Sequence, residues 1–84
     1  MNIFENMINH KISTLTAEEL LKYANQFQIS ISKQHASQIA DYLRGKNANI
    51  FSNGERAELI KQIAKIAGID TAKEVNRLFL LFTK

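Results

Sequence analysis

The chain has 84 residues, of which 45% are hydrophobic and 23% are charged, and its formal net charge is +3. This composition excludes a disordered chain, in which large apolar side chains are too few to form a core, and fits one domain spanning residues 1–84. The sequence contains no cysteine, which excludes disulfides and thiolate zinc sites and fits a reducing compartment.

The N-terminal stretch MNIFENMINHK bears on localisation. It mixes acid and amide groups into its apolar pattern and has no small-residue cleavage site, so it does not resemble a signal peptide. No apolar run approaches the roughly 20 residues needed to cross a bilayer. We therefore expect a soluble, cytoplasmic protein that has no membrane partner.

Apolar spacing and capping residues predict the first two helices. Four large apolar residues near the N-terminus share one side of a helix: Ile3, Phe4, Met7 and Ile8. The second helix starts at Thr16, whose side chain and that of Glu19 can each bond the other's backbone amide in a capping box. Leu20, Ala24 and Phe27 then point inward.

The third and fourth helices are predicted in the same way. Ser32 is expected to cap the third helix and Gly45 to end it, because glycine adopts a positive φ most easily. Ser52 and Glu55 form an S-x-x-E start signal for the fourth helix, which Gly68 is expected to close. Four residues of the third helix recur at helical spacing: Ala36, Ile39, Ala40 and Leu43.

The fifth helix is expected to begin with a capping box of Thr71 and Glu74. The pattern as a whole predicts an all-α, compact five-helix domain, made of two helical hairpins plus an N-terminal helix. A shift of 39 residues aligns the two hairpins, with Ser32 on Thr71. Shared apolar spacing produces much of that match in any two hairpins, so duplication stays a hypothesis.

The polar connector LRGKNANIFSNGER, residues 43–56, has two interpretations. In the structural one, it joins two helices and buries Ile50 and Phe51 beneath it. In the functional one, several polar side chains and the amides near Gly54 hold an anion at a helix N-terminus: Arg44, Lys46, Asn47, Asn49 and Asn53. Glu55 opposes an incoming anion, and the absence of Asp opposes a calcium loop.

Few residues suggest reaction chemistry. His10 and His35 are the only histidines, and without cysteine or an H-E-x-x-H spacing they do not indicate a metal site. The sequence has no recognisable nucleophile motif and no glycine-rich phosphate loop. We therefore expect no enzyme, no cofactor and no small-molecule substrate.

The charge is unevenly distributed. Residues 1–31 hold two basic and three acidic groups, whereas residues 32–84 hold nine basic and five acidic groups. A basic half can bind nucleic acid, with Arg44, Lys46, Lys61 and Lys65 as the expected contacts. Basic groups in this half are interleaved with acids, however, as on an ordinary solvated helix face. Nucleic-acid binding is therefore the less favoured of two functional hypotheses, behind interaction with a protein.

The stretch LFLLF near the C-terminus supports the favoured hypothesis, which is association with another protein chain. The inward stripe of the last helix comprises Val75, Leu78, Phe79 and Phe82. Leu80 falls on the opposite side and Leu81 on the flank, so this helix is apolar on more sides than a small core covers. We expect a protein-interaction module that forms a homodimer or another self-associated assembly through the C-terminal helix, with Leu80 and Leu81 at the contact. In the alternative, the N-terminal helix covers both leucines.

Five stretches in order resemble a known family: LTAEELLKYANQFQIS, LRGKNANIF, Glu55 with Arg56, IAKI and AKEVNRLFLLFTK. From about Ile12 to Lys84 the chain is similar to the YqfT-like proteins, a small family of unknown function from spore-forming Gram-positive bacteria. The resemblance implies one small helical domain in the cytoplasm. It implies no catalytic or binding residues.

Overall fold

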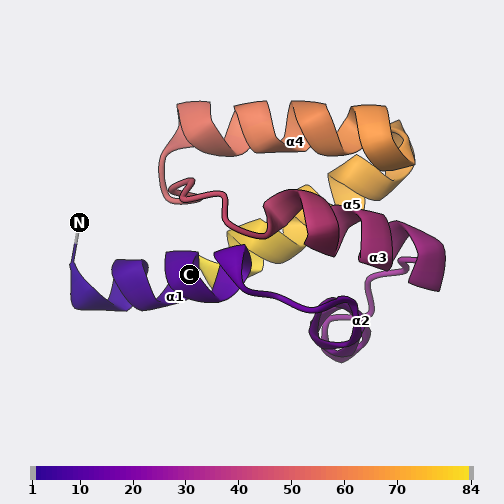
Figure 1. The fold of residues 1–84 in the computed structure, drawn as a ribbon, viewed down its shortest axis with the longest axis horizontal. Coiled ribbons are helices and arrows are strands. Elements are labelled where there is room, and N and C mark those ends of the chain that lie inside the picture. Colours follow the sequence, from indigo (N-terminus) through magenta and orange to yellow (C-terminus); the bar gives the residue numbers. More distant parts are fainter. Residues whose placement is uncertain (1, 84) are drawn as a thin grey trace.

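The computed structural model describes residues 2–83, which form five α-helices and no strand (Figure 1). The helices are α1 (Ile3–Ser13), α2 (Ala17–Gln26), α3 (Lys33–Leu43), α4 (Asn53–Ala67) and α5 (Ile69–Phe82). The predicted all-α class is confirmed.

Successive helices pack on one another. α2 contacts α3, α3 contacts α4, and α4 contacts α5, so α2–α3 and α4–α5 are the two helical pairs. α1 extends past the end of the other helices at its N-terminal side, whereas its C-terminal half lies beside the end of α5 (Figure 1). Within residues 2–83, no helix combines the length and the apolar character that crossing a bilayer requires.

Capping residues explain where most helices begin and end. The backbone N–H of Glu19 donates to Thr16 Oγ1, and the N–H of Thr16 donates to Glu19 Oε1, both at 3.1 Å. This is the predicted capping box. Ser32 Oγ caps α3 by accepting from the N–H of His35 at 3.1 Å. Gly45 has a φ of 80° after the end of α3, as predicted for a C′ glycine.

The predicted capping box of Thr71 and Glu74 is wrong. An N-cap at Thr71 would make Ala72 the first residue of the helix, whereas α5 begins earlier, at Ile69. Gly68 has a φ of 92°, a left-handed conformation that lets the chain leave α4 and enter α5 within one residue. The start of α5 therefore depends on a glycine and not on a side-chain cap.

Thr71 and Glu74 contact other groups instead. Thr71 lies inside the first turn of α5, with its Oγ1 3.3 Å from Nδ1 of His35 on α3. Glu74 Oε2 accepts from Nη2 of Arg77 at 3.1 Å. Ser32, which the 39-residue shift aligns with Thr71, is an N-cap, so the two aligned residues have different roles.

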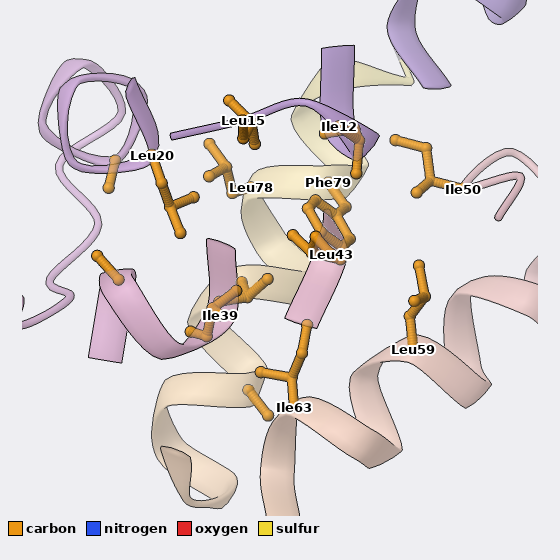
Figure 2. Packing of buried hydrophobic residues seen from close by; sticks show 14 of the residues in the cluster. Ile12, Leu15, Leu20, Ile39, Leu43, Ile50, Leu59, Ile63, Leu78 and Phe79 are labelled. Carbon is orange, nitrogen blue, oxygen red and sulfur yellow. The ribbon is translucent and has the colours of Figure 1, made fainter. Parts of the chain in front are cut away.

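The core collects apolar side chains from all five helices and from both long connections. Phe79 is fully buried and lies among the labelled side chains of α1, α3 and α5 in Figure 2. Ile50 of the connector is also fully buried, and Phe51 is half-buried against the same cluster. The predicted burial of Ile50 beneath the connector is confirmed. Other residues that are at most 1% exposed are Leu15, Leu20, Ala24, Ala36, Ile39, Ala40, Leu43, Ile63, Val75 and Leu78.

Phe27 differs from its prediction. Leu20 and Ala24 of α2 are buried as expected, but the Phe27 side chain is 41% exposed. α2 ends at Gln26, and Phe27 is its C-cap residue, so the helical periodicity that would turn this side chain inward stops before it. Phe27 therefore lies at the edge of the core.

Phe79→Ala is expected to lower the free energy of unfolding by about 3–5 kcal/mol, because it removes a buried ring and leaves a cavity at the centre of the core. Leu80→Ala is the matched control, since its side chain is 38% exposed one position further along the same helix. Urea denaturation followed by circular dichroism measures both. A loss for Phe79→Ala no larger than that for Leu80→Ala would contradict this description of the core.

Candidate interaction surfaces

The two leucines predicted to mediate self-association lie in different environments. Leu80 is 38% exposed, whereas Leu81 is half-buried and packs against the core. Residues eleven apart fall on the same side of a helix, so Leu80 shares its side of α5 with Ile69, which is 66% exposed. Of the two leucines, Leu80 is therefore the one that presents apolar surface to solvent.

A groove of about 440 Å³ runs between α4 and α5. Its apolar lining residues are Ala57, Ile60, Ala64, Ile69 and Ala72. The remaining lining residues are polar or basic: Asn53, Arg56, Lys61, Lys73 and Asn76. No acidic residue of the described chain lines this groove, so its charged lining residues are all cations.

The first two turns of α1 carry an apolar surface that faces away from the protein. Ile3, Phe4 and Met7 are 78%, 56% and 65% exposed. At about 100° per residue, these three lie opposite Asn9 and Ser13, which face the rest of the chain. The large apolar side chains early in α1 are thus on its solvent side. We call Ile3, Phe4 and Met7 the outer face of α1.

A small apolar hollow lies where α1 meets α2 and α5. Its volume is about 180 Å³, and its lining residues are Ile8, Lys11, Ile12, Tyr23 and Phe82. The rings of Tyr23 and Phe82 meet edge to face at 5.5 Å, and Phe27 contacts Phe82 with 6.2 Å between the ring centres. The hollow therefore has aromatic walls, and Ile8 in its lining lies one helical turn after Phe4 of the outer face of α1.

The connector between α3 and α4 is held by amide side chains. Asn9 Nδ2 donates to Asn49 Oδ1 at 2.9 Å, and Asn9 Oδ1 accepts from the N–H of Ile50 at 3.0 Å. Asn49 Oδ1 also accepts from the N–H of Phe51 at 3.0 Å. Glu55 Oε1 accepts from the N–H of Asn49 at 3.1 Å instead of completing a capping box with Ser52. The bonds of Asn9 fasten α1 to the connector.

The structure brings together only some of the residues predicted to contact an anion. Asn47 and Asn49 line a polar hollow of about 210 Å³ with Asn6, Asn9, His10 and Ala48. Arg44 lies elsewhere and pairs with Asp41 at 3.1 Å, and Lys46 Nζ lies 4.8 Å from the centre of the Tyr42 ring. These two cations contact groups of their own chain.

Lys61 and Lys65 lie on α4 and are exposed. Glu58 is close to both, and the hydrogen bond from Gln62 at 3.0 Å, followed by the charge of Lys61, lowers the pKa of its carboxyl group. The two lysines therefore lie beside an acid and do not form a purely basic surface. Among the described residues, no three His, Asp or Glu side chains are grouped as a metal site requires.

An ion pair between Lys11 and Glu19 joins α1 to α2. The hydrogen bond from Lys11, together with that from the Thr16 backbone, lowers the pKa of the Glu19 carboxyl group. The same hydrogen bond to Glu19 raises the pKa of Lys11. Both shifts favour the charged forms, so the pair stabilises the fold while both groups are ionised.

Sequence reasoning missed the role of Asn9, the groove and the apolar hollow. Helical periodicity places Asn9 only on the polar side of the first helix, and its partner Asn49 lies 40 residues away, a pairing that no local pattern reveals. One sequence feature could have indicated the groove: the small residues Ala57, Ala64 and Ala72, because alanines on facing helices leave space between them.

Asn49→Ala is expected to lower the free energy of unfolding by about 1–3 kcal/mol, since it removes the acceptor for the side-chain amide of Asn9 and for the N–H of Phe51. Asn47→Ala, two residues earlier and exposed, is the control and is expected to change it by less than about 0.5 kcal/mol. Chemical denaturation measures both. Equal effects of the two changes would contradict the anchoring role of Asn49.

Glu19→Gln is expected to lower stability at neutral pH by removing the charge that faces Lys11. Because the folded-state pKa of Glu19 is lowered, its contribution is present above the unfolded pKa and disappears as pH falls through the folded one. The difference in stability between Glu19→Gln and the unmodified chain should thus vanish in acid. Thermal unfolding from pH 2 to pH 8 measures this difference, with Glu18→Gln in the same turn as control. A difference in stability that stays constant at all pH values would refute a stabilising ion pair between Lys11 and Glu19.

Comparison with known proteins places the chain among proteins of unknown function. The family described as "Protein of unknown function (DUF2624)" matches residues 1–83. The chain is 42% identical over 83 residues to "Uncharacterized protein YqfT" of Bacillus subtilis (strain 168), with 99% of each chain covered. No solved structure matches it. The resemblance to YqfT-like proteins is confirmed, and the chain belongs to the DUF2624 family.

Proposed function

We propose that this protein is a non-enzymatic interaction module that associates with itself. The observation that carries the proposal is the outer face of α1, where Ile3, Phe4 and Met7 are each more than half exposed on a helix held by its opposite side. Single exposed apolar residues are ordinary, but a contiguous apolar surface on a small domain marks a contact with another molecule. The commonest such contact is with an identical subunit.

The exposed side of α5 gives further support. Leu80 and Ile69 add apolar surface on one side of α5, and Ile69 also lines the groove with α4. Leu80 thus stays a candidate contact residue, and Leu81 contributes through its half-exposed flank. The proposed location is the cytoplasm, because a chain of 84 residues without cysteine suits a reducing compartment.

Nucleic-acid binding is the competing proposal, and the arrangement of cations favours it less. Arg44 is paired with Asp41, and Lys61 and Lys65 lie beside Glu58. To contact these cations, a phosphate backbone must displace the acids beside them, which weakens nucleic-acid binding. The two proposals differ in their response to salt, since phosphate contacts weaken steeply with ionic strength and an apolar contact does not.

Light scattering on the purified chain between micromolar and millimolar concentration is expected to return twice the chain mass of 9.6 kDa at the upper end. The dimer should persist when sodium chloride is raised to 1 M, because its contact is apolar. A mass of one chain at every concentration would overturn the proposal. A mass that doubles only when short duplex DNA is added would favour the competing one.

A further inference from the structure

We infer that two copies form a two-fold dimer in which Phe4 of each copy enters the aromatic-walled hollow of the other. The inference rests on the proposed function and names its contact. Each copy carries a projecting ring and a hollow on neighbouring parts of the same helix. In a two-fold dimer the ring of each copy enters the hollow of the other, so the same contact forms twice, because a symmetric interface uses the same surface on both subunits.

The positions along α1 allow this exchange. Phe4 precedes Ile8 by one helical turn and Ile12 by two turns, and both isoleucines line the hollow. A two-fold axis across α1 near Met7 places two copies of α1 antiparallel, with the first turn of one beside the last turn of the other. Phe4 of each copy then lies over the lining residues of its partner.

The size and chemistry of the hollow suit a phenyl ring. Its volume is about 180 Å³, and an apolar cavity of about 150 Å³ accommodates benzene. Tyr23 and Phe82 supply aromatic walls, and aromatic rings in contact favour edge-to-face packing. Lys11, the one charged residue among the described lining residues, is paired with Glu19, so an entering ring does not leave its charge without a partner.

Charge favours the antiparallel arrangement over the parallel one. The first turn of α1 carries the acid Glu5, and its last turn carries His10 and Lys11. Antiparallel helices oppose the two helix dipoles, so the partly positive first turn of each α1 lies beside the partly negative last turn of the other. Parallel helices would place like charges side by side.

The area is that of a reversible dimer. The exposed parts of Ile3, Phe4 and Met7 amount to roughly 400 Å² per copy, since a large side chain has on the order of 200 Å². A standard interface buries about 800 Å² per partner. The lining residues of the hollow, which Phe4 of the partner would cover, add to this area, so the contact is smaller than the standard size and fits a weak, concentration-dependent dimer.

Phe4→Glu tests the inference, because position 4 is exposed and the change should leave the monomer folded. We expect its dimer dissociation constant, measured by analytical ultracentrifugation, to rise more than about 30-fold, as for loss of a central contact residue. Gln38→Glu on the exposed side of α3 is the matched control and is expected to leave the constant unchanged, whereas Leu80→Glu tests whether the exposed side of α5 forms the contact instead. Circular dichroism checks that each variant keeps its helices.

The three outcomes are distinct. A dimer that Phe4→Glu dissociates and Leu80→Glu does not supports the inference. A dimer that survives Phe4→Glu, or that only Leu80→Glu dissociates, overturns the inference and leaves the proposed function intact. A chain that stays monomeric at millimolar concentration overturns both.

A single introduced cysteine tests the symmetry. The sequence has no cysteine, so Met7→Cys can form a disulfide only with another copy. Residues near a two-fold axis approach their own counterparts, and we therefore expect Met7→Cys to form a covalent dimer under mild oxidation. Gln38→Cys, at an exposed position of α3 outside the proposed contact, should stay largely monomeric on the same gel. Crosslinking of Gln38→Cys without crosslinking of Met7→Cys would overturn the arrangement.

Discussion

The side chain of Asn9 determines which side of α1 faces the protein. Its amide bonds both Asn49 and the backbone of Ile50, two groups of a connector that lies some 40 residues further along the chain. Two turns of α1 project beyond these bonds, so fixing Asn9 inward also fixes Ile3, Phe4 and Met7 outward. The exposed apolar surface is therefore a consequence of one polar contact, supported by the burial of the last turn of the helix.

Local chemistry made much of the fold predictable. Helix starts at Thr16 and Ser32 depend on bonds that span three residues, and the inward residues of α3 and α5 follow from helical periodicity. The error at Thr71 has a physical reason. A helix in this region can start with a side-chain cap at Thr71 or directly after a glycine with a positive φ. The chain uses Gly68, so α5 begins at Ile69, before Thr71.

The candidate surfaces were less predictable, because they depend on contacts between distant segments. Helical spacing groups the residues of the outer face of α1, but the direction of that group depends on the pairing of Asn9 with Asn49. By contrast, helical position already separates Leu80, opposite the inward stripe of α5, from Leu81 on its flank, and the structure makes the first exposed and the second half-buried. The hollow needs side chains from three helices: Ile8, Tyr23 and Phe82.

Hydrogen exchange of the α1 backbone amides at low and high protein concentration tests the central claim most directly. The outer face of α1 is exposed and the N-terminal part of this helix extends past the other helices (Figure 1), so its amides should exchange rapidly when the chain is dilute. We predict that residues 5–9 become more protected as concentration rises, while exposed α3 amides do not change. Equal exchange of α1 at both concentrations, in a sample that light scattering shows to be dimeric, would contradict the claim that α1 forms the contact.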